Sequence, residues 1–179
     1  MEGFMNKILI GLSLLIVSLC INTTDVSAKG KTITMSIMNT DGLSIGTASL
    51  VQDGDNVKIH LQASQLTAGV HGIHIHENGQ CDPPDFKTAG AHFNPINHQH
   101  GFNNPKGFHN GDLPNIEVSS DGTIDVELIT SVVTLKKGEA NSLLKKKGTS
   151  LVIHADADDY VTDPAGNSGA RIACGVISK

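Results

Sequence analysis

Apolar and polar residues alternate along most of the chain beyond residue 31, with the two-residue period of a half-buried β-strand. Residues 32–39 (TITMSIMN) and 57–63 (VKIHLQA) show the alternation most clearly, and Asp41-Gly42 between strands is a typical hairpin turn. Eight segments are predicted to be strands: 32–39, 44–51, 57–63, 70–76, 116–119, 123–129, 150–154 and 172–177. Short strands separated by turns, without helical periodicity, indicate an antiparallel all-β domain.

Two long segments interrupt this pattern. Residues 77–113 form a loop of more than 30 residues, which is unusual inside a compact domain and generally functional. A second loop covers 155–170, and a polar connection covers 135–148. We expect metals and a disulfide to order the long loop. Within the connection, residues 145–147 (KKK) are expected to be a solvated turn, with polyanion binding as the alternative.

The N-terminal segment 1–28 is predicted to be a signal peptide and not part of the fold. Lys7 is followed by an apolar run at 8–21, and Val26-Ser27-Ala28 supplies small residues for cleavage after Ala28. The run is shorter than the roughly 20 residues of a membrane-spanning helix. Cys20 raises the alternative of a lipid anchor, although Leu19 before it is bulky for that signal. The remainder, 29–179, is predicted to be one exported domain, either secreted or associated with the cell envelope.

Composition narrows the classes of function. The 179 residues are 39% hydrophobic, which suits one domain, and a net charge of -5 argues against a general binder of nucleic acid or anionic membranes. Contact with a membrane is expected only if Cys20 is lipidated. Removal of the leader leaves Cys81 and Cys174, and an even pair in an exported protein favours a disulfide. Two free buried thiols are the alternative.

The histidines carry the strongest chemical pattern. Seven of the nine lie between residues 71 and 112. His74 and His76 are two apart on a predicted strand, so both rings point to one face, although such a pair alone is more often a surface feature. His92, His100 and His109 follow within the long loop, and imidazoles with a carboxylate suit Zn²⁺ or Cu²⁺. The pattern therefore predicts a metal centre.

On these residues the chain resembles the copper-zinc superoxide dismutases, over essentially all of 29–179. The motifs that carry the resemblance are GIHIHENG (72–79), AGAHFNP (89–95), GDLPN (111–115), IHADADD (153–159) and GNSGARIACGVI (166–177). The resemblance implies an eight-stranded antiparallel Greek-key β-sandwich or barrel with two long functional loops. It also implies an oxidoreductase that disproportionates superoxide to O₂ and H₂O₂ at a histidine-bridged Cu²⁺/Cu⁺ and Zn²⁺ site, protecting against extracellular superoxide.

The resemblance assigns roles to individual positions. His74, His76, His92 and His154 match the copper ligands, and His92, His100, His109 and Asp112 match the zinc ligands. His92 is thus the bridge between the metals and the expected proton carrier. Arg171 matches the cationic residue that guides the anionic substrate. Asp158, with neighbouring Asp159 as the alternative, matches a carboxylate linking a copper histidine to a zinc histidine, His71 matches a structural histidine, and Cys81 and Cys174 match the family disulfide.

One departure and two alternatives complete the interpretation. Many relatives carry lysines before the arginine, whereas 155–170 has no Lys or Arg and contains four aspartates, so weaker attraction of superoxide is expected. A non-catalytic metal-binding or structural member of the fold is the alternative function. A copper store would be expected to use Met- or Cys-rich ligands, which this site lacks. The sequence leaves a homodimer open.

Overall fold

The computed structural model describes residues 32–178, and the predicted leader at 1–28 lies outside the described residues. The described chain forms nine strands and one short 3-10 turn, η1 (Lys87–Ala89). The strands are β1 (Thr32–Asn39), β2 (Ser44–Asp53), β3 (Asn56–Ala63), β4 (Gly69–His71), β5 (Ile73–His76), β6 (Ile116–Val118), β7 (Ile124–Thr130), β8 (Thr149–His154) and β9 (Arg171–Ile177). No helix among these residues is long and apolar enough to cross a membrane.

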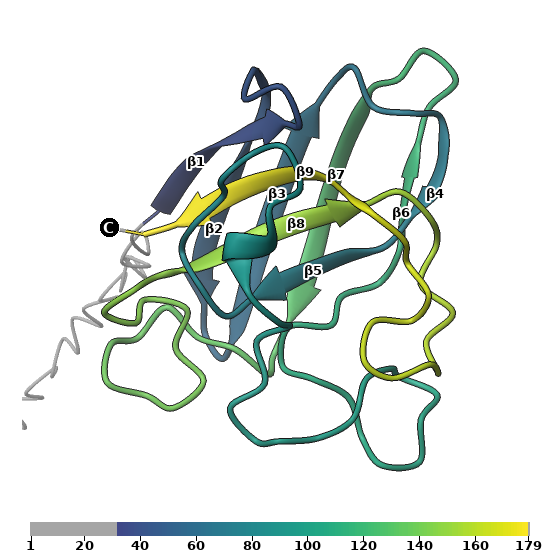
Figure 1. The fold of residues 1–179 in the computed structure, drawn as a ribbon. Helices are drawn as coiled ribbons and strands as arrows, with labels where there is room; N and C mark the ends of the chain where they lie inside the picture. The colour runs from purple at the N-terminus through teal and green to yellow at the C-terminus, as the bar shows by residue number, and fades with distance from the viewer. Residues whose placement is uncertain (1–31, 179) are drawn as a thin grey trace, which may run out of the picture.

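The strands build a curled antiparallel barrel. Seven of them form one sheet in the order β5-β8-β9-β1-β2-β3-β7, and β4 pairs with β6 in a second sheet. Figure 1 shows β9, β8 and β5 crossing in front of β2, β3 and β7. Because β4 leads directly into β5 and β6 leads into β7, the β4–β6 pair joins the two edges of the large sheet. The predicted all-β, antiparallel Greek-key class is confirmed.

Alternation along the strands fills the space between the layers. In β1, Ile33, Met35 and Ile37 are buried while the residues between them are exposed. Burying each such aliphatic side chain contributes roughly 1.5–3 kcal/mol. In β8, by contrast, every residue is buried. Its second face is covered by the long loop, where Phe86 and Cys81 pack on Val152 in a separate apolar cluster.

One predicted strand is divided in two. The sequence predicts one strand over 70–76, but this segment breaks at Gly72 into β4 and β5, so residues 32–178 form nine strands and not eight. The Gly72 N–H donates to the carbonyl of Asp156 (2.8 Å), and the Gly72 carbonyl accepts from the N–H of His154 (2.8 Å). A Cβ at this position would lie 2.9 Å from the Ser168 side chain. The break lets β4 pair with β6 while β5 turns to pair with β8.

The long loop is held by backbone pairing with β5. Bridges place His92 opposite His76 and Asp112 opposite His74. Ile75 between them donates its N–H to Gly111 and accepts from Phe93, both at 2.8 Å. Regular backbone bonds thus fix two segments that lie 20 residues apart in the loop, and they bring the loop's polar side chains against those of β5.

Candidate metal centre

Four buried histidine nitrogens converge from three parts of the chain. They belong to His74 and His76 on β5, His92 in the long loop and His154 at the end of β8, and their ligating atoms lie within 4.8 Å of one another. Within residues 32–178, Nδ1 of His74 and Nε2 of the other three have no hydrogen-bond partner, although all four atoms are buried. Buried polar atoms are normally satisfied, so four convergent unpaired nitrogens fit a metal ion with imidazole ligands, such as copper.

In His74, His76 and His154, the other ring nitrogen faces a hydrogen-bond acceptor. His74 donates from Nε2 to Asp158 Oδ2 (2.8 Å) and His76 from Nδ1 to the Gly90 carbonyl (3.0 Å), while His154 Nδ1 lies 3.4 Å from the Gly169 carbonyl. A neutral imidazole that donates from one nitrogen carries a lone pair on the other. These contacts therefore turn the lone pairs of all three rings toward the shared space.

A second group converges on Asp112. Its Oδ1 lies 2.9 Å from His92 Nδ1, 3.0 Å from His100 Nδ1 and 3.3 Å from His109 Nδ1. Its Oδ2 accepts the backbone N–H groups of Gly101 and His109, both at 3.0 Å. Three imidazole nitrogens and one carboxylate oxygen form a donor set that suits Zn²⁺. His92 belongs to both groups, with one nitrogen in each.

The ring of His74 also lies close to the atoms around Asp112. A set of ligating atoms from His74, His92, His100 and Asp112 lies within 4.8 Å, without His109. The His74 ring reaches this set because its centroid is 4.0 Å from that of His92. Its Nε2 is already bonded to Asp158, however, and its Nδ1 faces the first group. His109 is therefore the better fourth member of the Asp112 group.

Asp158 links the two groups. Its Oδ2 accepts from His74 and its Oδ1 from His100 (3.0 Å). The side chain of Asn115 holds it in place, donating to the Asp158 carbonyl and accepting its N–H, both at 2.9 Å. Asp159, the alternative, is exposed and bonds locally to Thr162. The structure places Asp158, and not Asp159, against both groups.

Burial and hydrogen bonding shift the pKa values of the histidines in the two groups in different directions. Burial lowers the pKa of His74, His92 and His154 to about 4, and it lowers the pKa of His76 well below its usual value. Burial also opposes charge on His100, but the hydrogen bonds that its ring donates to Asp112 and Asp158 raise its pKa to about 9. The first group is therefore neutral, as metal-binding imidazoles must be.

The two carboxylates show the opposite behaviour. Burial alone would raise the pKa of Asp112, but hydrogen bonds from His100, His109 and His92 hold that pKa far below its usual range. Hydrogen bonds from His100 and His74 likewise outweigh burial and lower the pKa of Asp158. Both aspartates are therefore anionic and can neutralise cationic charge in the centre.

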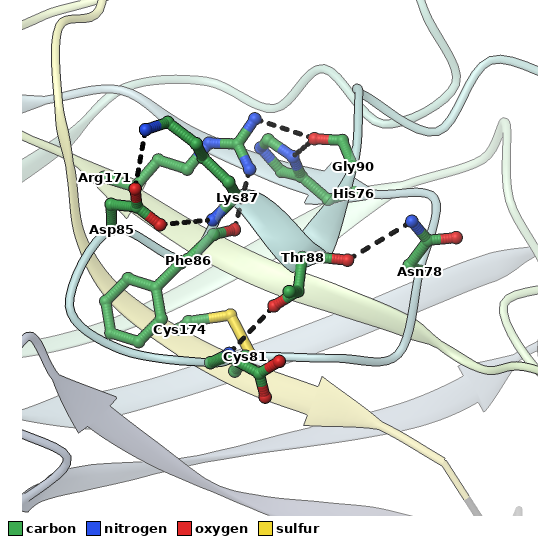
Figure 2. Close-up of a disulfide and its surroundings, with 11 residues drawn as sticks. His76, Asn78, Cys81, Asp85, Phe86, Lys87, Thr88, Gly90, Arg171 and Cys174 are labelled. Carbon is green, nitrogen blue, oxygen red and sulfur yellow. Dashed lines mark hydrogen bonds and ion pairs between the residues drawn. A yellow bond between two sulfur atoms is a disulfide. The ribbon is translucent and has the colours of Figure 1, made fainter.

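Arg171 lies beside the first group and is fixed by the long loop. Its Nη1 donates to the Phe86 carbonyl (2.8 Å) and its Nη2 to the Gly90 carbonyl (2.7 Å). Figure 2 shows that the Gly90 carbonyl also receives the bond from His76. The guanidinium is thus coupled to a histidine of the first group through one shared oxygen, and it remains partly exposed.

The predicted disulfide is confirmed. Cys81 in the long loop is bonded to Cys174 on β9, with their Cα atoms 5.7 Å apart (Figure 2). It encloses a sequence separation of 93 residues. The bond anchors the loop that supplies the carbonyl partners of Arg171, so it supports the site as well as the fold.

We expect reduction of Cys81–Cys174 to lower the free energy of unfolding by about 2–5 kcal/mol, because the unfolded chain regains the entropy of a long open loop. Thermal melts of zinc-loaded, copper-free protein with and without reductant measure the change. The Cys81→Ser/Cys174→Ser variant is the control and should not respond to reductant. Two free thiols in the intact mass of the untreated protein would contradict the prediction.

His71 and three further residues complete the surroundings. His71 lies in neither group; its ring nitrogens are each 2.8 Å from a backbone carbonyl, those of His154 and Thr67. Sequence reasoning did not identify Phe86, Gly90 or Asn115 as parts of the site. Asn115 ends the GDLPN motif, which was a usable signal, whereas a backbone carbonyl such as that of Gly90 has no signature in sequence.

Comparison with known proteins agrees with this geometry. The family model described as copper/zinc superoxide dismutase matches residues 44–177. The chain is 53% identical over 142 residues to "Superoxide dismutase [Cu-Zn] 1" of Aquifex aeolicus, covering 79% of this chain and 84% of the relative. It is 41% identical to an "Extracellular superoxide dismutase [Cu-Zn]" of Haemonchus contortus, covering 74% and 73%.

A solved structure gives the same result for the fold. The crystal structure of a SOD-like protein from Bacillus subtilis superposes with a TM-score of 0.76 at 44% identity, covering 80% of this chain and 97% of that one. Family match, identity and fold agree over the same region as the histidine groups. The chain belongs to the copper/zinc superoxide dismutase family.

Proposed function

We propose that the two histidine groups are the metal sites at which this superoxide dismutase converts two superoxide anions and two protons into O₂ and H₂O₂. Copper is assigned to His74, His76, His92 and His154, and zinc to His92, His100, His109 and Asp112. The observation that carries the assignment is the set of four buried, unpaired nitrogens that point at one another. Three Nδ1 atoms around one carboxylate oxygen support the zinc assignment.

The protein residues prepare and protect this chemistry. Bound copper supplies one-electron redox chemistry, and zinc, which has no redox chemistry, supplies structure and charge. Asp158 and the Gly90 carbonyl keep the copper histidines in the tautomer that binds metal. Arg171 offers a fixed, partly exposed cation that attracts and orients a small anion.

His92 has a distinct role because its Nδ1 contacts Asp112 while its Nε2 is one of the four unpaired nitrogens. We assign it as the proton carrier of the reaction. Its Nε2 lies among the copper-facing nitrogens, while Asp112 holds its Nδ1 at 2.9 Å. A proton held at Nε2 is therefore positioned where reduced oxygen must be protonated.

Metal analysis combined with a superoxide-dismutation assay tests the function. Protein loaded with copper and zinc is expected to bind one of each and to be active, while zinc-only protein is inactive. A loaded protein without activity would favour the alternative, a non-catalytic member of the fold. That alternative is not favoured, since a histidine occupies each of the four copper positions.

Electrostatic attraction of superoxide is expected to be weak, and Asp85 is one reason. Lys87 lines the same surface recess as Arg171, but it forms an ion pair with Asp85 at 2.7 Å (Figure 2). We expect Asp85→Asn to raise kcat/KM about two- to threefold at low salt and to steepen its fall with ionic strength, because Lys87 is then unneutralised. Asp82→Asn, an exposed residue of the same loop, is the control. A rate equally insensitive to salt in both variants would argue against this effect.

We further propose that the protein is exported and that cleavage follows Ala28. The support is the leader-like composition of 1–28, the disulfide, and a relative named as extracellular. Intact-mass analysis of the processed protein distinguishes its forms. A chain beginning at Lys29 indicates free release, an acylated Cys20 indicates a lipid anchor, and an unprocessed chain would refute export.

We also propose that two copies associate through the surface formed by the long loop and the end of β7. Ile96, Phe102 and Ile129 are 51%, 40% and 54% exposed, and Phe108 and Val132 line recesses beside them. An exposed apolar patch of this kind often marks a protein interface. Sedimentation velocity should give a dimer that Ile129→Lys dissociates and that Leu43→Lys, at an exposed position elsewhere, does not. A monomeric wild-type protein would refute the dimer.

A further inference from the structure

The connection between β7 and β8 concentrates positive charge in an otherwise acidic domain. Residues 136–147 contain five lysines and one glutamate. The other described residues contain three lysines, one arginine and fifteen acidic side chains. A solvated turn requires no such separation of charge, so the distribution indicates a surface with its own binding partner.

These lysines line a recess. It has a volume of about 690 Å³. Its lining residues are Lys137, Gly138, Glu139, Ser142, Leu144, Lys145, Lys146, Lys147, Gly148 and Ser178. All four lining lysines are exposed, and none forms an ion pair within residues 32–178. Lys136 stands at the flank, 4.0 Å from Asp55. We call this recess the lysine groove.

The backbone of the lysine groove is ordered by hydrogen bonds. Leu143 is fully buried and donates its N–H to the Thr134 carbonyl (2.9 Å), which joins the two arms of the connection. The Lys147 carbonyl accepts from Gly79 in the long loop (3.1 Å), and the Gly148 N–H donates to Lys145 (3.0 Å). The lysines are therefore presented from a fixed frame, so binding orders side chains and not the backbone.

We propose that the lysine groove binds a linear polymer of phosphodiester-linked polyols. Ammonium groups bind phosphates as point charges, and lysines on both arms can contact successive phosphates along a chain. The lining contains no aromatic residue, whereas single-stranded nucleic acids are generally bound by stacking of bases on aromatic rings. A recess also fits a chain better than the flat surface of a membrane.

Occupancy of the lysine groove leaves Arg171 uncovered. Arg171 begins β9 and Ser178 follows its last residue, so the groove and the arginine lie at opposite ends of the strand. The six steps from Arg171 to Ile177 along the extended strand span about 20 Å, which is more than twice the screening length in physiological salt. Binding at the groove should thus retain the enzyme at a polymer without reducing its activity.

The test measures binding of metal-loaded protein to fluorescently labelled poly(glycerol phosphate) at low salt. We expect Lys146→Gln/Lys147→Gln to weaken binding about tenfold, with affinity falling as salt rises. Lys58→Gln/Lys106→Gln removes two lysines outside the groove and should change affinity less than about twofold. Lys145 is left intact because its ammonium lies 4.6 Å from the ring of Phe93, next to His92. Dismutase activity of both variants should match the wild type.

Three competitors identify the source of binding. Glycerol phosphate monomer, vesicles of phosphatidylglycerol and single-stranded oligothymidylate are each added to the labelled complex. The proposal is supported if the unlabelled polymer displaces the label at far lower phosphate concentration than any of the three. It is overturned if the wild type does not bind, if both double variants bind alike, or if vesicles or oligothymidylate compete as well as the polymer.

Discussion

Replacing His154 with alanine is expected to abolish dismutation while zinc stays bound. His154 supplies one of the four unpaired nitrogens, and it is the member of the proposed copper group that comes from β8, whereas His74 and His76 come from β5. It makes no contact with Asp112, around which the zinc group is built. Activity should fall by at least about a hundredfold, because removing a mere hydrogen-bond partner of a metal ligand already costs 10–100-fold.

The experiment separates loss of copper from loss of structure. Metal content is measured after loading, and His154→Asn accompanies the alanine variant because it leaves a smaller cavity in this buried position. His98→Ala changes an exposed histidine of the long loop that belongs to neither group; it is the control and should stay active. Full activity in either His154 variant, or loss of zinc together with copper, would contradict the division of the centre into two sites.

The period-two pattern was enough to predict the class of fold. The alternating residues of β1 and β3 are buried as expected, because a strand at the surface of a barrel has one face toward the core. The break between β4 and β5 could not be predicted from that pattern. It depends on Gly72 meeting Asp156 and His154, residues that lie more than 80 positions later and have no local signature.

In the metal centre, too, contacts between residues far apart in the sequence could not be predicted. Histidine spacing alone predicted a metal centre, and the family resemblance divided the histidines between copper and zinc. The choice between adjacent Asp158 and Asp159 required the fold, because Asn115, 43 positions earlier, fixes the backbone of the first. The partners of Arg171 are carbonyl oxygens of Phe86 and Gly90, which any residue type would offer.

The lysines illustrate how a local prediction can be incomplete. Residues 145–147 are exposed, as a solvated turn would be. Lys137 lines the same recess. It comes from the first arm of the connection, which is held beside the second arm by the hydrogen bond from the Leu143 N–H to the Thr134 carbonyl. A run of charge becomes a groove only when a second arm faces it, and that pairing is a property of the tertiary structure.

Replacing Asp112 with alanine should have the second large effect, on zinc and on stability together. Five donors meet this carboxylate: three imidazole nitrogens and the N–H groups of Gly101 and His109. Without it, buried donors lose their acceptor, and each unsatisfied group costs about 1–3 kcal/mol. We expect metal-free Asp112→Ala to lose at least about 3 kcal/mol of unfolding free energy.

Zinc binding distinguishes a ligand from a purely structural carboxylate. Zinc raises the melting temperature of the wild type by mass action, since the ion binds the folded state. In Asp112→Ala that rise should shrink, because affinity falls by more than about a hundredfold.

Asp112→Asn keeps an acceptor oxygen for the backbone donors but removes the negative charge, so it should recover part of the metal-free stability without recovering zinc affinity. Asp41→Ala, on an exposed hairpin, is the control and should leave both quantities unchanged. If Asp112→Ala bound zinc as tightly as the wild type, the carboxylate would be a structural hub only, and the fourth ligand would have to come from His74, the other residue whose nitrogen reaches this group.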